Sequence, residues 1–167
     1  RYKGILYGGF MATSNGIKLI EYNARLGDPE AMNVLTILKT DIIDIFDSIG
    51  KGTISELNIN FDNKATVCKY AVPEGYPDKP IKGKKIDITS VSNKDSLFFA
   101  SVDIEGDHLI EAGSRTVAVV GIANSISQAE KIAEEEISKV GGPLFHREDI
   151  GTDDLIRARV EHMESLR

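Results

Sequence analysis

Two short hydrophobic runs separated by a turn predict a β-hairpin at the start of the chain. Residues 4–11 and 17–23 read as its two strands. The Asn15-Gly16 pair between them favours a tight turn, because it tolerates the positive φ that such turns need. Side chains alternate across a strand, so residues two apart on the return strand should share a face.

Hydrophobic residues then recur at helical spacing from residue 29 to residue 49, which predicts one long helix. Gly50 and Gly52 would end it. Residues 51–63 are polar with weak alternation, and we expect them to link two units.

The second half of the chain is predicted to hold short strands followed by helices. The expected strands are residues 65–72, 85–91, 97–104, 108–112 and 117–123. Residues 73–80 contain three prolines and should form a loop. A capping box at Ser127–Glu130 predicts the start of one helix, and residues 153–166 a second, charged one. Strands followed by helices, without regular βαβ alternation, indicate an α+β fold.

Composition excludes several classes of function. The 167 residues suffice for one domain or two small ones. The net charge of −6, with no basic cluster, argues against nucleic acid as a partner. No apolar run approaches the roughly 18 residues of a membrane span, so no membrane partner is expected. Cys68 is the single cysteine, which excludes an internal disulfide and a cysteine-based zinc site.

The chain begins with Arg1 rather than Met, so we expect a fragment or a processed chain. No signal peptide is recognisable, and a cytoplasmic location is expected. Of the histidines, His108, His146 and His162 are scattered and are expected to be structural or exposed. Lys69 gives no independent signal.

The chemistry of the chain is concentrated in residues 21–30. Glu21, Asn23 and Arg25 would place a carboxylate, an amide and a guanidinium on one strand face, where they could hold Mg²⁺ and the anion that it bridges. Asp28 suits a helix N-cap and Pro29 the first helical position. The helix start would then add anion-binding amides beside the metal.

The run Glu21-Tyr22-Asn23-Ala24-Arg25-Leu26-Gly27-Asp28-Pro29-Glu30 resembles the magnesium-binding segment of the ATP-grasp ligases. Within them it is most similar to the phosphoribosylamine–glycine ligase family. The preceding Gly4-Ile5-Leu6-Tyr7-Gly8-Gly9-Phe10-Met11 also fits that family, as do Gly75-Tyr76-Pro77 and Arg147-Glu148-Asp149-Ile150-Gly151. The resemblance spans nearly the whole chain in the family's order.

The resemblance implies two domains within a longer enzyme. Residues 1–60 would be the C-terminal part of an ATP-grasp domain, and residues 61–167 a small α+β domain with a mixed or barrel-like sheet and helices. The implied reaction joins glycine to 5-phosphoribosylamine with ATP as co-substrate and Mg²⁺ or Mn²⁺ as cofactor. The missing N-terminal part of the enzyme would be a partner of this chain.

The resemblance also implies roles for individual residues. These are metal ligands (Glu21, Asn23), a catalytic cation (Arg25) and substrate contacts (Gly27, Asp28, Arg115). Arg115 lies in Gly113-Ser114-Arg115, where the family commonly has Gly-Gly-Arg and where backbone amides could hold a phosphate. Two features depart from the family. Residues 5–11 carry no further acidic ligand, and residues 98–101 lack the family's histidine.

Two other interpretations stay open on the sequence alone. One is another ATP-grasp ligase or carboxylase, since these share the Glu-x-Asn-x-Arg core. The other is an α+β binding module without catalysis, because the glycine-rich lid and ATP-gripping lysines of the family are not in these residues. The isolated chain is therefore expected to be inactive.

Overall fold

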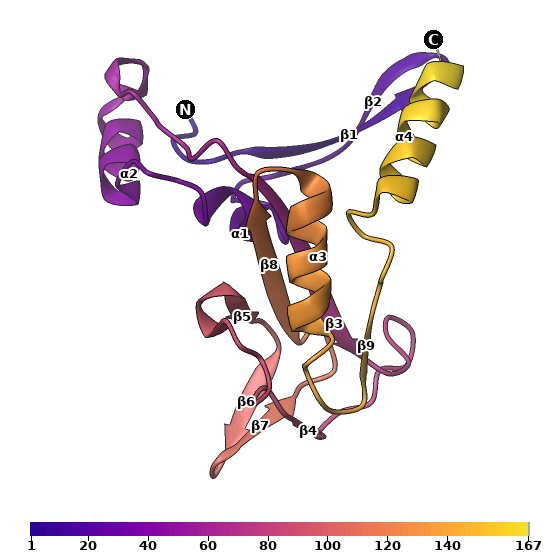
Figure 1. Cartoon of the computed structure of the whole chain (residues 1–167). Coiled ribbons are helices and arrows are strands. Elements are labelled where there is room, and N and C mark those ends of the chain that lie inside the picture. The colour runs from indigo at the N-terminus through magenta and orange to yellow at the C-terminus, as the bar shows by residue number, and fades with distance from the viewer. Residues whose placement is uncertain (167) are drawn as a thin grey trace. The chain divides into compact units, whose positions relative to one another are not determined.

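The computed structural model describes residues 1–166 and opens with the expected hairpin (Figure 1). β1 (Tyr7–Thr13) and β2 (Gly16–Asn23) pair antiparallel as a two-stranded sheet. Gly16 adopts a φ of 93°, as the tight turn requires. The register shifts between Gly9 and Phe10, so β2 carries one extra residue. Several large hydrophobic side chains of the hairpin are exposed: Phe10, Met11, Ile17, Leu19, Ile20 and Tyr22.

The single helix predicted over residues 29–49 is wrong. The structure has two helices, α1 (Glu30–Leu35) and α2 (Ile42–Lys51). Between them the backbone pairs with the segment around Phe61, so the helix is interrupted although hydrophobic residues continue. Asp41 then caps α2 by accepting a hydrogen bond from a backbone amide of its first turn.

Residues Lys64–Leu155 form a compact unit of their own, and residues 1–63 with those from Ile156 onward form another. In the Lys64–Leu155 unit, one antiparallel sheet has the order β5 (Leu97–Phe99), β8 (Val117–Ala123), β3 (Ala65–Pro73), β9 (Leu144–His146). A second has the order β4 (Lys85–Ile86), β7 (His108–Glu111), β6 (Val102–Glu105). The α+β class is confirmed, with two small antiparallel sheets where a mixed or barrel-like one was expected.

Short helical elements complete the described chain. They are α3 (Ile126–Ile137), α4 (Asp153–Ser165), and the 3₁₀ turns η1 (Ile54–Glu56) and η2 (Lys94–Ser96). The capping box predicted at Ser127–Glu130 lies two residues too late in the chain. Ser125 is the N-cap of α3 and accepts from the Gln128 amide, whereas Ser127 lies in the first helical turn.

Two strand expectations also need correction, and one further strand was not expected. The strand expected over residues 97–104 is divided between two sheets, because Ala100 and Ser101 turn to bond with Thr116 and Arg115. Of the strand expected over residues 85–91, the first two residues form β4, and Asp87 makes an isolated antiparallel bridge with Gly141. β9 was missed altogether, since three residues carry no recognisable period.

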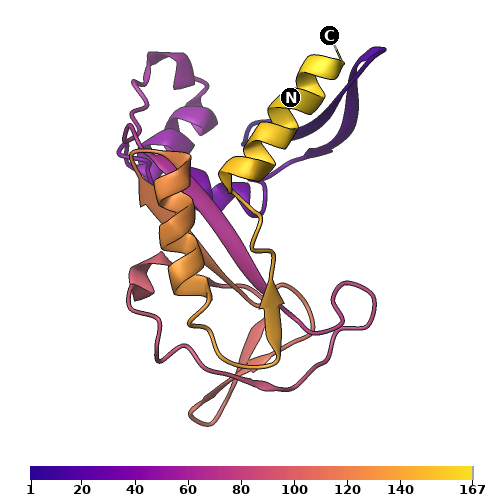
Figure 2. The same ribbon diagram turned by 45° about the vertical axis from the view of Figure 1, so that its right-hand side comes forward.

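Helix α3 lies directly against the sheet formed by β3 and β8 (Figure 2). A Cβ at Gly121 of β8 would lie 1.9 Å from the carbonyl oxygen of Ala129, so only glycine allows this approach. Buried apolar side chains fill the space around the sheet, among them Ala71, Ile86, Val117, Val119 and Ile137. Cys68 on β3 is a small buried side chain, as expected.

A buried lysine is the main surprise of this unit. The side chain of Lys69 on β3 is fully buried, and its Nζ donates to Glu130 Oε1 at 2.7 Å and to the carbonyl oxygen of Glu148 at 2.8 Å. It also pairs with Glu134, whose Oε1 lies 2.9 Å from His146 Nε2. We call these residues the Lys69 cluster. It joins β3, α3 and the segment after β9, and gives His146 the structural role expected for it.

The Lys69 cluster predicts how stability depends on pH. Burial opposes ionisation of Glu134, but hydrogen bonds from Lys69 and His146 outweigh it, so the pKa of Glu134 lies below its usual 4.5. A lowered carboxyl pKa contributes stability above the unfolded value, and this is lost as pH falls through the folded value. We expect the free energy of unfolding to fall below pH 4.5, and to fall less steeply in Glu134→Gln. Urea titrations between pH 7 and pH 3 measure this. An equal slope in both proteins would contradict it.

Candidate functional site

Glu21 and Asn23, the two expected metal ligands, meet at the end of β2. The Asn23 side-chain amide donates to Glu21 Oε1 at 2.9 Å. Glu21 is exposed and Asn23 is half-buried. The expectation that these two side chains point the same way from one strand is therefore confirmed, although their role in metal binding stays a prediction.

The geometry of this pair suits a divalent cation. Mg²⁺ takes oxygen ligands at about 2.0–2.1 Å in an octahedron, so neighbouring ligands stand about 3.0 Å apart. The Asn23 amide and the Glu21 carboxylate have this separation, and rotating the amide by half a turn presents its oxygen in place of nitrogen. Among residues 1–166 no three His, Cys, Asp or Glu side chains form a cation site. The pair would thus supply two ligands and leave the others to phosphate and water.

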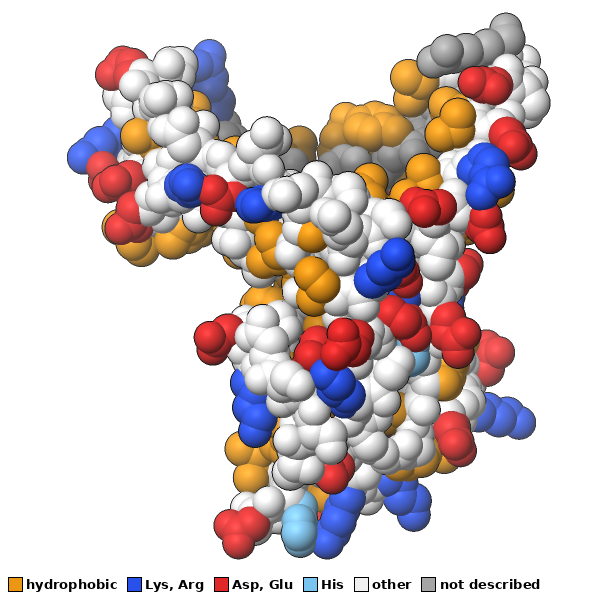
Figure 3. All heavy atoms as spheres, in the orientation of Figure 1, with side chains coloured by type: hydrophobic (Ala, Val, Ile, Leu, Met, Phe, Trp, Pro, Cys, Tyr) orange, Lys and Arg blue, Asp and Glu red, His pale blue; other side chains and the backbone are white. Residues whose placement is uncertain are grey.

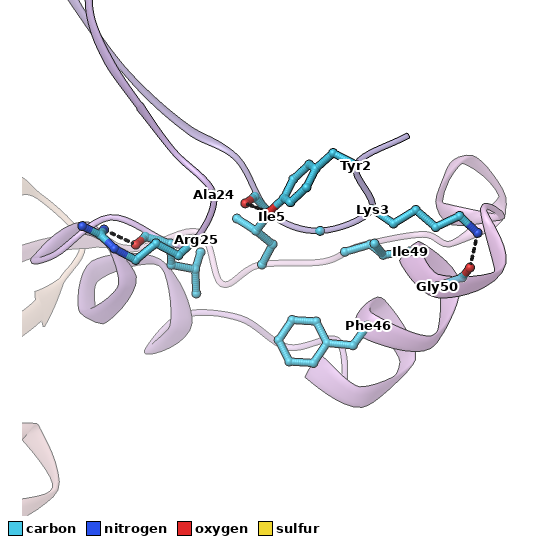
Figure 4. A pocket seen from close by; sticks show the side chains of 10 residues that line it. Tyr2, Lys3, Ile5, Ala24, Arg25, Phe46, Ile49 and Gly50 are labelled. Carbon is cyan, nitrogen blue, oxygen red and sulfur yellow. Dashed lines mark hydrogen bonds between the residues drawn. The ribbon is translucent and has the colours of Figure 1, made fainter.

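Arg25 is placed differently from the expectation. β2 ends at Asn23, so the strand alternation does not extend to Arg25. Its guanidinium donates to the carbonyl oxygen of Leu26 at 2.8 Å. Figure 4 shows the guanidinium directed away from a hollow of about 460 Å³, toward which Phe46 and Ile49 of α2 extend. Its contact with a phosphoryl group stays a prediction that requires the side chain to reorient.

The start of α1 is not built as the sequence suggested. The N-cap position belongs to Pro29, without a side-chain cap, so the capping role expected for Asp28 is wrong. The first turn is instead held through the backbone, because the carbonyl oxygen of Gly27 accepts from the amide of Ala31 at 2.9 Å. α1 has six residues, which is too short for the anion-binding helix start that we expected.

Gly27 itself is required by its surroundings. It is buried, and a Cβ there would lie 2.4 Å from Glu30 Oε2 and 3.1 Å from the Tyr7 ring. The hydroxyl of Tyr7 donates to Glu30 Oε1 at 2.8 Å, and this hydrogen bond raises the pKa of Tyr7. Gly27 therefore allows β1 and the first turn of α1 to meet beside the Glu21–Asn23 pair. Substrate contact by Gly27 and Asp28 stays a prediction.

The Gly113–Arg115 loop carries the last expected site residue. Gly113 has a φ of 84°, and its amide donates to Glu111 Oε2 at 2.8 Å. This amide is therefore already bound to a carboxylate, which contradicts its expected use for a phosphate. The guanidinium of Arg115 lies 5.3 Å from the centroid of the Tyr70 ring, a cation–π contact.

Comparison with protein families decides the affiliation. A profile described as "Phosphoribosylglycinamide synthetase, C domain" matches residues 66–153, more than half of the chain. The chain belongs to the phosphoribosylglycinamide synthetase family. The profile of the ATP-grasp (A) domain of phosphoribosylglycinamide synthetase matches residues 1–31, which include the Glu21–Asn23 pair.

Curated relatives agree with this family. A phosphoribosylamine–glycine ligase of Methanococcus maripaludis (strain C7) is 51% identical over 168 residues, and one of Methanocaldococcus jannaschii is 50% identical over 169. Each alignment covers 99% of this chain and 38% of the relative. The chain thus spans 38% of the length of these synthetase relatives.

A solved structure supports the same fold. The crystal structure of phosphoribosylamine–glycine ligase from Thermotoga maritima superposes with a TM-score of 0.70 and 28% sequence identity. The match covers 87% of this chain and 36% of that one.

No helix within residues 1–166 is long and apolar enough to cross a membrane.

The sequence analysis missed two features of this synthetase chain. One is the Lys69 cluster, whose only signal was the spacing of Glu130 and Glu134 one turn apart on α3. The other is Glu111, a carboxylate that is 1% exposed at the end of β7. A polar residue at the end of a short strand gives no sign of burial, so only the fold reveals it.

Proposed function

We propose that this chain is the metal-binding and C-terminal part of an ATP-dependent ligase that joins glycine to 5-phosphoribosylamine. The products would be glycinamide ribonucleotide, ADP and phosphate, in de novo purine biosynthesis. The observation that carries the proposal is the identity of about half of all residues, across 99% of the chain, to proteins named phosphoribosylamine–glycine ligase.

The division into domains is part of the same proposal. We assign residues 1–60 to the end of an ATP-grasp domain and residues 61–167 to the small C-terminal domain. The two compact units support a boundary near residue 63, but they group the residues from Ile156 onward with the first unit and so do not support the assignment of that end to the C-terminal domain. The exposed hydrophobic side chains of β1 and β2 support the assignment of residues 1–60 to a larger domain, because strands that are apolar on both faces are typical of the interior of a larger sheet.

The reaction would proceed in two steps. The γ-phosphoryl group of ATP passes to the glycine carboxylate, which releases ADP and forms glycyl phosphate. The amine of phosphoribosylamine then attacks the glycyl carbonyl carbon, phosphate leaves, and the amine loses a proton. Phosphorylation is needed because a carboxylate is a poor electrophile, and the protein contributes positioning and charge neutralisation.

Each site residue has a part in these steps. Glu21 and Asn23 would hold Mg²⁺ or Mn²⁺ against the ATP phosphates, where the ion neutralises charge. Arg25 would reorient from Leu26 toward the phosphoryl group during transfer. Gly27 and Asp28 would border the substrate, and Arg115 would contact the ribose phosphate. We place the enzyme in the cytoplasm, since these substrates are free, charged metabolites.

A coupled assay of ADP release by the full-length protein tests this proposal. We expect ADP formation that requires both glycine and phosphoribosylamine, and no such activity from residues 1–167 alone. The isolated chain serves as the control, because it carries the metal pair without the longer relatives' remaining 62%. ADP formation that requires bicarbonate instead of glycine would overturn the proposal in favour of a carboxylase.

A further inference from the structure

The buried carboxylate of Glu111 fastens two loops together. Its Oε2 accepts from the amide of Gly113 at 2.8 Å, and its Oε1 accepts from the amide of Lys84 at 3.1 Å. The backbone adds two bonds, from the Gly83 amide to the Glu111 carbonyl and from the Glu111 amide to the Lys84 carbonyl. Glu111 is only 1% exposed, and each of its carboxylate oxygens accepts a hydrogen bond from a backbone amide of one of the two loops.

The side chain of Lys82, in the loop before β4, packs against Gly113 in the loop after β7. A Cβ at Gly113 would lie 2.5 Å from Cε and 2.6 Å from Cγ of Lys82, so the aliphatic part of Lys82 occupies that space. Glycine at position 113 therefore both permits the φ of 84° and makes room for Lys82. Within residues 1–166 the ammonium of Lys82 has no hydrogen-bond or ion-pair partner.

The local charge around these loops is opposite to that of the chain. Residues 79–85 include four lysines and no acidic residue, although the net charge of the chain is −6. The expectation that the chain has no basic cluster is therefore wrong for residues 79–85. In Figure 3 basic side chains lie at the end of the unit that carries β4. Arg115, two residues after Gly113, adds a guanidinium oriented by Tyr70.

We propose that Lys82 and Arg115 bind the same phosphate, that of a pentose-phosphate substrate, and that Glu111 is a positioning residue for both. The inference rests on the proposed function, because it assigns one part of that substrate to these loops. A phosphate monoester has several terminal oxygens, so a guanidinium and an ammonium can bind it together. Glu111 acts only through the backbone of the two loops, which fixes where each cation stands.

Steady-state kinetics of the full-length protein test the role of Lys82. Lys82→Met keeps the aliphatic contact with Gly113 and removes the charge. We expect KM for phosphoribosylamine to rise about tenfold, as for the loss of one charged contact, with kcat and the KM values of ATP and glycine unchanged. Lys82→Arg should restore KM to within about threefold. Lys79→Met, in the same segment, is the matched control and should behave as wild type.

Glu111→Gln tests positioning against mere stability. A glutamine has one acceptor oxygen, so it cannot serve the amides of both Gly113 and Lys84. We expect the same selective rise in KM for phosphoribosylamine. A lowered melting temperature with all three KM values unchanged would show that Glu111 is only structural and would overturn its positioning role.

Titration with D-ribose 5-phosphate separates this inference from the proposed function. Wild type should bind it at least about tenfold more tightly than Lys82→Met does, and D-ribose should bind neither. If this holds while the ligase assay fails, the phosphate site stands and the proposed function is wrong. If ligase activity is present but Lys82→Met changes neither binding nor KM, the phosphate site is wrong.

Discussion

Replacing Glu21 with alanine should reduce ligase turnover of the full-length protein by at least about 100-fold. A Mg²⁺ ligand neutralises charge on the phosphoryl group as it moves, and such stabilisation is worth several kcal/mol, with about 1.4 kcal/mol for each factor of ten. Glu21 is exposed and its side chain accepts a hydrogen bond from Asn23, so its loss should leave the fold intact.

The measurement is kcat over a series of Mg²⁺ concentrations, together with a melting curve. Glu56→Ala is the matched control, since Glu56 is an exposed glutamate in η1 of the same compact unit. It should keep wild-type turnover. Normal activity of Glu21→Ala at every Mg²⁺ concentration would remove Glu21 from the mechanism.

Replacing Lys69 with methionine should lower the free energy of unfolding by about 3 kcal/mol. Removing one partner from a buried ion pair costs roughly 3–5 kcal/mol, because the other charge stays uncompensated. The lower end applies here, since the side chains of Glu130 and Glu134 are 13% and 32% exposed and can be partly hydrated. Methionine keeps most of the side-chain volume, so the loss reports charge rather than a cavity.

Urea unfolding of the chain at pH 7 measures this effect. Lys64→Met is the control, because Lys64 is exposed and bonds Asn124 at the surface, and it should change stability by less than about 0.5 kcal/mol. Adding Glu130→Gln and Glu134→Gln to Lys69→Met should recover part of the loss, since no charge is then left unpaired. Unchanged stability in Lys69→Met would mean that water already compensates the two carboxylates.

The sequence predicted local features of the fold well and long-range ones poorly. The hairpin turn at Asn15-Gly16 depends on adjacent residues only, and the structure has it as expected. The break between α1 and α2 depends on pairing with residues near Phe61, some twenty positions away, which no local period records. The position of Lys69 depends on α3 and on Glu148, so its burial could not be inferred from its neighbours.

The candidate site divides in the same way. Glu21 and Asn23 lie within one strand, where side-chain alternation applies, and they meet as predicted. Arg25 and Asp28 lie beyond the end of β2, where the backbone turns and alternation carries no information. Recognition of the family motif implied a catalytic cation at Arg25 and a substrate contact at Asp28, and residue type alone suggested that Asp28 is a helix cap. Only the structure shows that Arg25 bonds Leu26 and that Asp28 does not cap α1.

The Lys69 cluster also has a consequence for the order in which the chain folds during synthesis. The partners of Lys69 follow it by 61, 65 and 79 residues, and β3 pairs with β8 and β9 rather than with an earlier strand. During synthesis β3 therefore leaves the ribosome before its partner strands. Lys69 cannot be buried until α3 and Glu148 have also emerged. Contacts so distant in sequence form late and together. We therefore expect the Lys64–Leu155 unit to fold only after Glu148 has been synthesised.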